Sequence, residues 1–394
     1  MEQWKKYKLS DICDLIAGFA FKSIDFGTEG VSVVKIKDIQ PPFVNLDNAD
    51  KVNLSAYDID KLKKFLISKG DFLLAMTGAT IGKIGKYISN EQSYLNQRVL
   101  KFLPKQQVDS KFLYYSLLTH AFQLYILNHI DSDSAQPNIS ANTIGKYELS
   151  IPCIKTQKRI ADILSTFDNK IELNRRINDN LEQQAQTLFN YYFVEKPELL
   201  GDVEVGNLTQ IASYTNGLAM QCFRPNSNEK GLPVLKIKEL GQNTVDATSD
   251  RCTSDIDESY KVYDGDVIFS WSGTLMVKVW TGGNCGLNQH LFKVTSKEYP
   301  KWFYYFWTKH HLDKFIRIAK DKAVTMGHIK RGELEKSEVL IPCAEKLNQI
   351  GLLINPLFER GIEVALENRN LAEARNSLLP NLMSGGLIIN DFNC

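Results

Sequence analysis

The stretch TQKRIADILSTFDNKIELNRRINDNLEQQAQTLFNYYF, residues 156–193, contains no proline and no glycine. Apolar residues recur in it at alternating spacings of four and three, which is the heptad pattern of a helix that packs against another helix. An asparagine at such a seam typically fixes the register of the packing. We therefore predict one long helix whose seam contains Ile160, Leu164, Phe167, Ile171, Asn174, Asn178, Leu181, Ala185, Leu188 and Tyr192.

A second segment repeats this seam 190 residues later, with Asn368 at the position equivalent to Asn178. Pro356 and Gly361 interrupt it, and we expect them to kink or shorten the first half of the second helix. The two helices are expected to pack as an antiparallel coiled coil, although two unrelated amphipathic helices remain an alternative. The second seam comprises Ile350, Ile354, Leu357, Gly361, Val364, Asn368, Leu371, Arg375, Leu378 and Leu382.

The segments before each helix are also repeated. Leu9-Ser-Asp-Ile-Cys13 with Gly18 returns as Leu208-Thr-Gln-Ile-Ala212 with Gly217, and Ile151-Pro-Cys153 returns as Ile341-Pro-Cys343. Between these lie repeats of a Lys-Ile-Lys segment, a Gly-Asp-hydrophobic segment and a Leu-Asn-Gln segment. The offset falls from 199 (208 − 9) to 190 (341 − 151) along the chain. Matches in one order with a slowly drifting offset indicate two copies of one module.

Each copy combines predicted strands with a predicted helix, so the fold class is α+β with two tandem mixed α/β domains. In the first copy we predict strands at 31–36, 71–76 and 98–103 and a helix at 112–127. The second copy should contain an aromatic helix over 302–318. We expect a first domain at 1–151, a spacer helix at 152–195, a second domain at 196–341, and a second spacer helix with a tail at 342–394.

The composition is that of an ordinary soluble protein, with 24% charged residues and a net charge of +1. No apolar run reaches the ~20 residues of a membrane span, and we expect a cytoplasmic protein. The charge is uneven: residues 61–105 carry nine Lys and Arg against two acids, and residues 301–331 carry eight against two. Local basic patches of this kind can bind a phosphate backbone, although they are often only solvated faces.

Two motifs imitate enzyme signatures but depart from them. Gly78-Ala-Thr-Ile-Gly82-Lys83 has three residues between its glycines, whereas a phosphate-binding loop has four and a Ser or Thr after the lysine. Gln40-Pro-Pro-Phe43 resembles an adenine-positioning loop of DNA methyltransferases but lacks the first Asp or Asn. The cysteines and histidines show no metal-binding spacing. We therefore predict no catalytic, cofactor-binding or metal-binding residues in this chain.

The repeated polar segments are the candidate binding residues. Amide and basic side chains carry the donors and acceptors that suit base edges and phosphates. The alternative is that these residues only cap strands or complete turns. The candidate DNA-binding residues are Phe21, Lys22, Lys35, Lys37, Thr77, Gly78, Thr80, Lys83, Asn96, Gln97 and Arg98 in the first copy, and Lys236, Lys238, Ser272, Thr274, Lys278, Asn288, Gln289 and His290 in the second.

These segments together resemble a known family. Several segments are similar to the specificity (S) subunit of type I restriction-modification systems: Gly18-Phe-Ala-Phe-Lys-Ser23, Gln136-Pro-Asn-Ile-Ser140, residues 157–164, 168–174 and 186–189, and Leu378-Leu-Pro-Asn-Leu-Met-Ser-Gly385. The likeness covers nearly the whole chain, and its most specific part is the first helix. The second helix departs from the pattern at Glu345-Lys-Leu-Asn348.

The resemblance implies two target-recognition domains that read the halves of an asymmetric bipartite DNA site, with the helices as a spacer. It also implies two methyltransferase subunits that carry S-adenosylmethionine and dock on the chain, and restriction-translocase subunits that join them. Three alternatives stay open: the recognition subunit of another restriction or methylation system, a self-contained methyltransferase or nuclease, and a coiled-coil scaffold that does not bind DNA.

Overall fold

The computed structural model describes residues 4–131, 137–321 and 329–387. The chain forms two compact units. Unit 1 joins Met1–Asp168 to Ala374–Cys394, and unit 2 is Asn169–Glu373. Each unit therefore contains one copy of the repeated module together with parts of both long helices.

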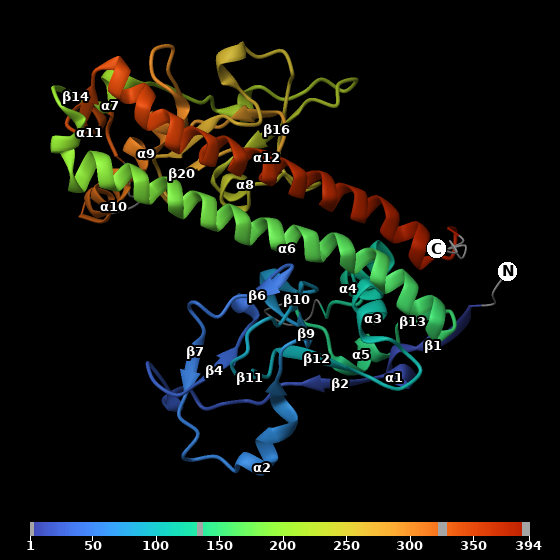
Figure 1. Ribbon diagram of the computed structural model, residues 1–394. Coiled ribbons are helices and arrows are strands. Elements are labelled where there is room, and N and C mark those ends of the chain that lie inside the picture. Colours follow the sequence, from blue (N-terminus) through green and yellow to red (C-terminus); the bar gives the residue numbers. More distant parts are fainter. Residues whose placement is uncertain (1–3, 132–136, 322–328, 388–394) are drawn as a thin grey trace, which may run out of the picture. The chain divides into compact units, whose positions relative to one another are not determined.

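The two long helices are α6 (Ile154–Asn190) and α12 (Ala344–Met383), and they pack together (Figure 1). α6 begins two residues before the predicted start and ends in a π-helical turn at Tyr191–Glu195. The expectation that Pro356 and Gly361 would shorten the second helix is wrong, because α12 continues through both. Pro356 itself is exposed, while Ile354 and Phe358 on either side of it are buried in the core and hold the helix in place.

Unit 1 contains a mixed β-structure whose six-stranded and five-stranded sheets lie beside short helices. The strand β4 is parallel to β11 and antiparallel to β7, so the sheets mix both directions as predicted. A separate two-stranded sheet is formed by β1 (Lys5–Lys8) and β13 (Glu148–Ile151). In sheet order, the six strands are β2 (Cys13–Ala17), β12 (Val99–Pro104), β9 (Phe72–Ala75), β10 (Ile84–Lys86), β6 (Phe43–Val44) and β5 (Ile39–Gln40). The five are β3 (Phe26–Gly27), β7 (Asp50–Val52), β4 (Val31–Val34), β11 (Ser93–Leu95) and β8 (Leu66–Ile67). The helices are α1 (Leu9–Ile12), α2 (Ile59–Leu62), α3 (Ser110–Leu117), α4 (His120–Asn128) and α5 (Ala141–Gly145).

Unit 2 repeats this arrangement with smaller sheets. Its four-stranded order β15-β22-β19-β20 corresponds to β2-β12-β9-β10 of unit 1, and β16 is parallel to β21 as β4 is to β11. The strands are β14 (Val203–Asn207) with β23 (Glu338–Pro342); β15 (Ser213–Asn216), β22 (Leu291–Thr295), β19 (Val267–Ser270) and β20 (Met276–Val279); and β17 (Arg251–Cys252), β16 (Leu232–Leu235), β21 (Cys285–Leu287) and β18 (Lys261–Val262). The helices are α7 (Leu208–Ile211), α8 (Ile237–Gln242), α9 (Lys301–His310), α10 (Leu312–Asp321) and α11 (Arg331–Glu335).

The predicted helix of each copy is in fact two helices. The break in unit 1 lies at Leu118 and Thr119, where Thr119 adopts an extended backbone and its hydroxyl donates to the Ser116 carbonyl at 2.7 Å. The break in unit 2 lies at His311. The apolar period continues across both breaks because the two short helices bury their faces in the same core. Periodicity alone therefore could not reveal the break.

The seam residues of α6 and α12 are buried or half-buried. In unit 1, Ile160 and Leu164 share a core with Leu379 and Leu382. In unit 2, the Asn368 amide donates to the Ile171 carbonyl at 3.2 Å, and the Asn174 amide donates to Glu367 at 2.9 Å. None of the described helices is long and apolar enough to cross a membrane.

Candidate nucleic-acid interface

Three polar segments that are far apart in the sequence meet at one end of β9 and β12 in unit 1. The Met76 backbone N–H donates to the Arg98 carbonyl, and the Gly78 N–H donates to the Pro137 carbonyl, both at 3.0 Å. The Ala75 N–H donates to the Lys83 carbonyl at 3.0 Å. We call residues 77–83, 96–98 and 137–138 the unit 1 loop cluster.

The equivalent segments meet in unit 2. The Trp271 N–H donates to the His290 carbonyl at 3.4 Å, and the Ile329 N–H donates to the Trp271 carbonyl at 3.2 Å. We call residues 271–275 and 288–290 the unit 2 loop cluster. The third segments, residues 137–139 in unit 1 and Ile329 in unit 2, were not among the predicted DNA-binding residues. Their place in the repeat, 190 residues apart, was the available signal.

The repeated turns form for the same backbone reason in both units. The carbonyl of Asn96 accepts from Val99 at 2.9 Å, and that of Asn288 accepts from Leu291 at 3.0 Å. A glycine packs against each turn: a Cβ on Gly18 would lie 2.2 Å from the Asn96 carbonyl oxygen, and one on Gly217 would lie 2.3 Å from that of Asn288. The repeated glycine is thus explained by a close backbone approach that only glycine permits.

The unit 1 loop cluster carries free cationic and amide groups. Lys83, Gln97 and Arg98 are exposed, and their side chains make no hydrogen bond or ion pair with any described residue. Asn96 is half-buried beneath them. A guanidinium, an amide and an ammonium group on one surface suit both base edges and phosphates.

The unit 2 loop cluster is more aromatic and less charged. Thr274 is exposed, whereas Gln289 and His290 are half-buried. The Trp271 indole donates to Asn216 at 3.0 Å, and its ring centroid lies 6.2 Å from that of His290. The Asn288 side chain is buried and donates to Gln289 at 2.7 Å, so only part of the predicted polar set is accessible.

Several predicted contact residues are buried, which corrects the sequence interpretation. Phe21 is 9% exposed and packs in an aromatic cluster with Phe19 and Tyr57, so it is not a surface contact, while the neighbouring Lys22 is exposed. Thr77 and Ser272 are also buried. They directly precede Gly78 and Gly273 in the chain, whose φ values of +72° and +65° turn the backbone. The Thr80 hydroxyl oxygen is buried as well.

Lys278 is not the counterpart of Lys83. In strand register, Ile84 pairs with Leu74, while the equivalent Phe269 pairs with Val277. The loop of the first copy is therefore two residues longer, and Lys278 matches Gly85. Lys278 is half-buried, donates to the Gly241 carbonyl at 2.7 Å, and burial lowers its pKa.

The lysines of the Lys-Ile-Lys segments form ion pairs with nearby acids. Lys35 and Lys37 lie 2.8 and 3.2 Å from Asp50, and this pairing lowers the pKa of Asp50. In unit 2, Lys236 forms an ion pair with Asp250 and Lys238 lies 3.6 Å from Asp246. The acid that ends each motif is buried and accepts the backbone N–H of the first lysine, at 2.8 Å for Asp38 and 3.3 Å for Glu239. The motif is repeated because it shapes this turn.

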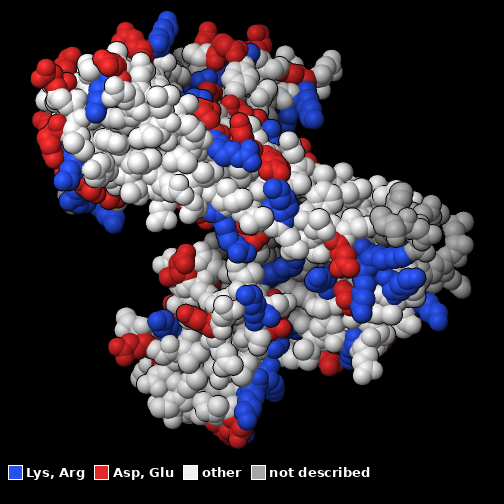
Figure 2. All heavy atoms as spheres, viewed as in Figure 1, with Lys and Arg blue, Asp and Glu red and all other residues white. Residues whose placement is uncertain are grey.

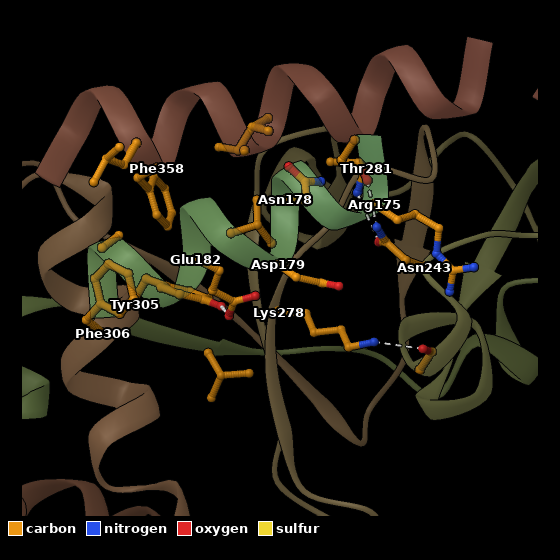
Figure 3. Close-up of a pocket in the computed structure, with 18 of the residues that line it drawn as sticks. Arg175, Asn178, Asp179, Glu182, Asn243, Lys278, Thr281, Tyr305, Phe306 and Phe358 are labelled. Atoms are coloured by element: carbon orange, nitrogen blue, oxygen red, sulfur yellow. Dashed lines mark hydrogen bonds between the residues drawn. The ribbon is translucent and has the colours of Figure 1, made fainter. Parts of the chain in front are cut away.

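A pocket of about 500 Å³ in unit 2 is lined by α6, α12 and the second domain (Figure 3). Glu182 in this pocket accepts from Tyr305 at 2.9 Å and from Lys309, and these donors outweigh burial to lower its pKa. No group of three or more His, Cys, Asp or Glu residues within the described ranges could hold a metal ion. On the face drawn in Figure 2, Lys and Arg are interspersed with Asp and Glu.

Nearly the whole chain is similar to proteins of one known family. A family model of the type I restriction modification DNA specificity domain matches residues 1–183 and 201–372. The specificity subunit of the type I restriction enzyme MjaIX from Methanocaldococcus jannaschii is 23% identical, over 99% of this chain and 95% of the relative. That of EcoBI from Escherichia coli is 26% identical, over 97% and 85%.

The fold also matches a solved structure. The crystal structure of a type I restriction-modification S subunit from M. genitalium superposes with a TM-score of 0.53 at 15% identity, covering 97% of this chain and 96% of that one. The family match together with this architecture settles the class of protein. The chain belongs to the type I restriction-modification specificity family and is a DNA specificity subunit, a non-catalytic component that carries no cofactor of its own.

Proposed function

We propose that each loop cluster reads one half of an asymmetric bipartite DNA site. The observation that carries this proposal is a pair of turns with the same backbone hydrogen bond that share Asn and Gln but differ in the third residue, which is Arg98 in unit 1 and His290 in unit 2. Identical backbones present their side chains at equivalent positions, so different side chains would select different bases. A symmetric reader would require the same residues in both turns.

The exposed side chains of unit 1 suit different parts of DNA, either base edges or phosphates. Arg98 can donate two hydrogen bonds to a guanine edge, and Gln97 can bond an adenine edge in both directions. Lys83, which lies on the adjoining loop, suits a phosphate contact. In unit 2, Gln289, His290 and Thr274 are the corresponding candidates. Lys35, Lys37, Lys236 and Lys238 are paired with acids and would contribute less to DNA binding than Lys83.

We further propose that domains 1–151 and 196–341 are the recognition domains and that the helices set their spacing. α6 has 37 residues, which at ~1.5 Å per residue is about 55 Å. Successive major grooves on one face of DNA recur every ~34–36 Å, so the half-sites would lie about one turn apart. Two methyltransferase subunits carrying S-adenosylmethionine would dock on the helices, restriction-translocase subunits would join them, and the complex would act in the cytoplasm.

Methylome sequencing of cells that express this chain with its methyltransferase tests the base-reading proposal. We expect one bipartite motif, and we expect Gln97→Ala to relax a single base position in one half-site. Lys6→Ala, an exposed lysine on β1 outside the loop cluster, is the control and should leave the motif unchanged. A motif unaffected by replacing all of Asn96, Gln97 and Arg98 with alanine would refute the assignment, and absence of duplex binding would favour a scaffold.

An insertion in α6 tests the spacing proposal. Four residues added after Asn178 lengthen the helix by ~6 Å and nearly preserve the seam phase. We expect the non-specific spacer of the motif to lengthen by about one or two base pairs, with both half-sites unchanged. Altered half-site bases, or an unchanged spacer in an active complex, would contradict a spacing role.

A further inference from the structure

A charged cluster in unit 1 connects the first domain to both long helices. Asp168 on α6 accepts from the Tyr115 hydroxyl at 2.6 Å, and its carboxylate lies 3.3 Å from the Lys86 ammonium. Arg375 on α12 donates to its other oxygen at 2.5 Å. The side chains of Asp168, Arg375 and Lys86 are only 16%, 19% and 25% exposed. We call Lys86, Tyr115, Asp168 and Arg375 the unit 1 clamp.

Unit 2 holds its domain with different residues. Arg369 on α12 donates to Asp264 at 2.7 Å and to the Thr281 carbonyl at 2.8 Å. Glu182 on α6 accepts from Tyr305 and Lys309 of α9, and Figure 3 shows Glu182 lying beside Tyr305. We call Arg369, Asp264, Glu182, Tyr305 and Lys309 the unit 2 clamp.

The two clamps are not copies of each other. At an offset of 190, Asp168 and Arg375 correspond to Phe358 and Ala185, while Glu182 and Arg369 correspond to Ala372 and Asp179. By strand register, Lys86 corresponds to Val279. Tyr115 and Tyr305 are the shared members. Each domain is thus joined to both helices by charge-assisted hydrogen bonds. The charged residues that make these bonds occupy different positions of the repeat in the two units.

The unit 2 pocket reflects this divergence. Ala185, Val279 and Phe358 all line it, and they correspond to three charged members of the unit 1 clamp. The unit 2 clamp instead attaches the domain through Glu182 and Tyr305, which line this pocket, and through Asp264 and Arg369, which are not among its lining residues. The attachment of a domain to α6 and α12 is therefore made at different positions of the repeat in the two units.

Buried ion pairs are poor sources of net stability, because desolvation offsets most of their attraction. Their hydrogen bonds are strongly directional, and a guanidinium group has a rigid donor geometry. Apolar packing alone allows a domain to rock on a helix, whereas several directional bonds to two helices allow one orientation. Such a contact is suited to orienting a domain.

We propose that the two clamps act as positioning elements that fix the orientation of each recognition domain on the helix pair, and thereby determine which spacer length the complex accepts. This inference rests on the proposed function. Lys86, Tyr115, Asp168, Arg375, Glu182 and Arg369 contribute to spacer discrimination without touching DNA. Weakening a clamp widens the accepted spacing while each half-site is still read correctly.

The test compares methylation by the chain assembled with its methyltransferase subunits on duplexes that carry the native spacer or one base pair more or fewer. The variants are Tyr115→Phe with Lys86→Met in unit 1, and Arg369→Gln in unit 2. Arg360→Gln is the matched control, since it breaks an exposed pair within α12, with Glu363, that does not reach a domain. For each clamp variant we expect the ratio of altered-spacer to native-spacer methylation to rise about tenfold, in keeping with the loss of charge-assisted hydrogen bonds. The control should keep the wild-type ratio.

A purely structural role would lower methylation on all three duplexes together and leave the ratio unchanged, and that result would overturn the inference. Tyr115→Phe alone removes one hydroxyl, and its ratio decides the question if the double variant does not fold. The failure of the proposed function is distinguishable: a wild-type motif that is not bipartite would remove the proposed function itself. A bipartite motif with unchanged ratios would remove only the clamps.

Discussion

The two units build one architecture on different side chains. Around Tyr115, unit 1 gathers the charged residues Asp168, Lys86 and Arg375. Around Tyr305, unit 2 places a different charged pair, Glu182 and Lys309, and adds the Phe358 ring at a centroid distance of 5.2 Å. Backbone features such as the glycine against each turn are the same in both. Duplication thus preserved what the backbone requires and allowed the contacts between domain and helix to diverge.

The loop clusters differ in the same way. Unit 1 exposes Lys83 and Arg98. In unit 2, Lys278 instead donates to the Gly241 carbonyl, and the Trp271 ring lies 6.2 Å from that of His290. Two half-site readers on one scaffold would have unequal electrostatic contributions to DNA binding. The unit 1 half-site should then depend more on salt than the unit 2 half-site.

The largest expected effect comes from breaking the unit 1 clamp. Asp168→Leu leaves Lys86 and Arg375 without their shared carboxylate, and we expect unit 1 to lose about 3–5 kcal/mol of unfolding free energy. Denaturant unfolding, with hydrogen exchange of α3 as the local readout, measures this loss.

The triple variant Asp168→Phe, Arg375→Ala and Lys86→Val makes unit 1 resemble unit 2. It removes the buried charges together, so we expect most of the lost stability to return, to within about 1–2 kcal/mol of the unmodified chain. A triple variant as unstable as the single one would show that the two solutions are not interchangeable.

The repeated glycines should respond equally in the two units. Gly18→Ala and Gly217→Ala each place a methyl group against a backbone carbonyl oxygen that cannot move away easily. We expect each to cost about 1–3 kcal/mol of unfolding free energy, measured in the same denaturant experiment. Gly27→Ala, where no atom lies within 4 Å of the new methyl group, should cost far less. Unequal losses at Gly18 and Gly217 would contradict a conserved backbone role.

Acid should weaken unit 2 before unit 1. Burial lowers the pKa of His311 from 6.5 to about 4. Between these values the unfolded chain binds a proton that the folded chain does not, so unit 2 loses stability as the pH falls, by roughly 1–2 kcal/mol. The pKa of Asp168 in unit 1 is lowered despite its burial, because Lys86, Tyr115 and Arg375 favour the carboxylate. Its contribution is therefore lost only as the pH falls below its normal value of 3.8.

Hydrogen exchange at pH 7 and pH 5 distinguishes the two units. Protection of α9 and α10 should fall at pH 5, while that of α3 should hold. His311→Gln removes the titrating group next to the Glu338 carbonyl and should reduce the difference for unit 2. The remainder belongs to the adjacent His310, whose pKa is also lowered by burial. Equal losses in both units at pH 5 would assign the effect to another group.

The smallest expected effect concerns Lys83 and Lys278, the two loop lysines that strand register shows are not equivalent. Lys83→Ala should reduce the slope of log Kd against log salt concentration by about one unit, if Lys83 contacts a phosphate. Lys278→Ala should leave that slope unchanged, because Lys278 is bonded to the Gly241 carbonyl. Fluorescence titration of a duplex across a salt series gives both slopes. A matching decrease in the two variants would argue that Lys278 reaches DNA.

The sequence predicted where the loop clusters lie, but not which of the predicted side chains are buried or paired. The repeated Asn-Gln turns and Gly-containing loops do come together in each unit. Lys35 and Lys37 appeared to be candidate phosphate contacts because Asp50, which forms an ion pair with each, is 15 residues from Lys35 (50 − 35). Phe21 was predicted to contact DNA because the neighbouring sequence does not show that the rings of Phe19 and Tyr57 pack against it.

By itself, the sequence determined the duplication, the two long helices and the positions of the repeated turns. These features depend on residue spacing along the chain, since heptads, glycines and turn residues act on their near neighbours. Only the tertiary structure decided which lysines are free, that Lys278 is two residues out of register with Lys83, and that Asp168 and Arg375 meet although 207 residues apart (375 − 168). Burial, register and ion pairing are set by contacts between segments that are distant in the sequence. A local sequence pattern does not specify which distant segment will pack against it.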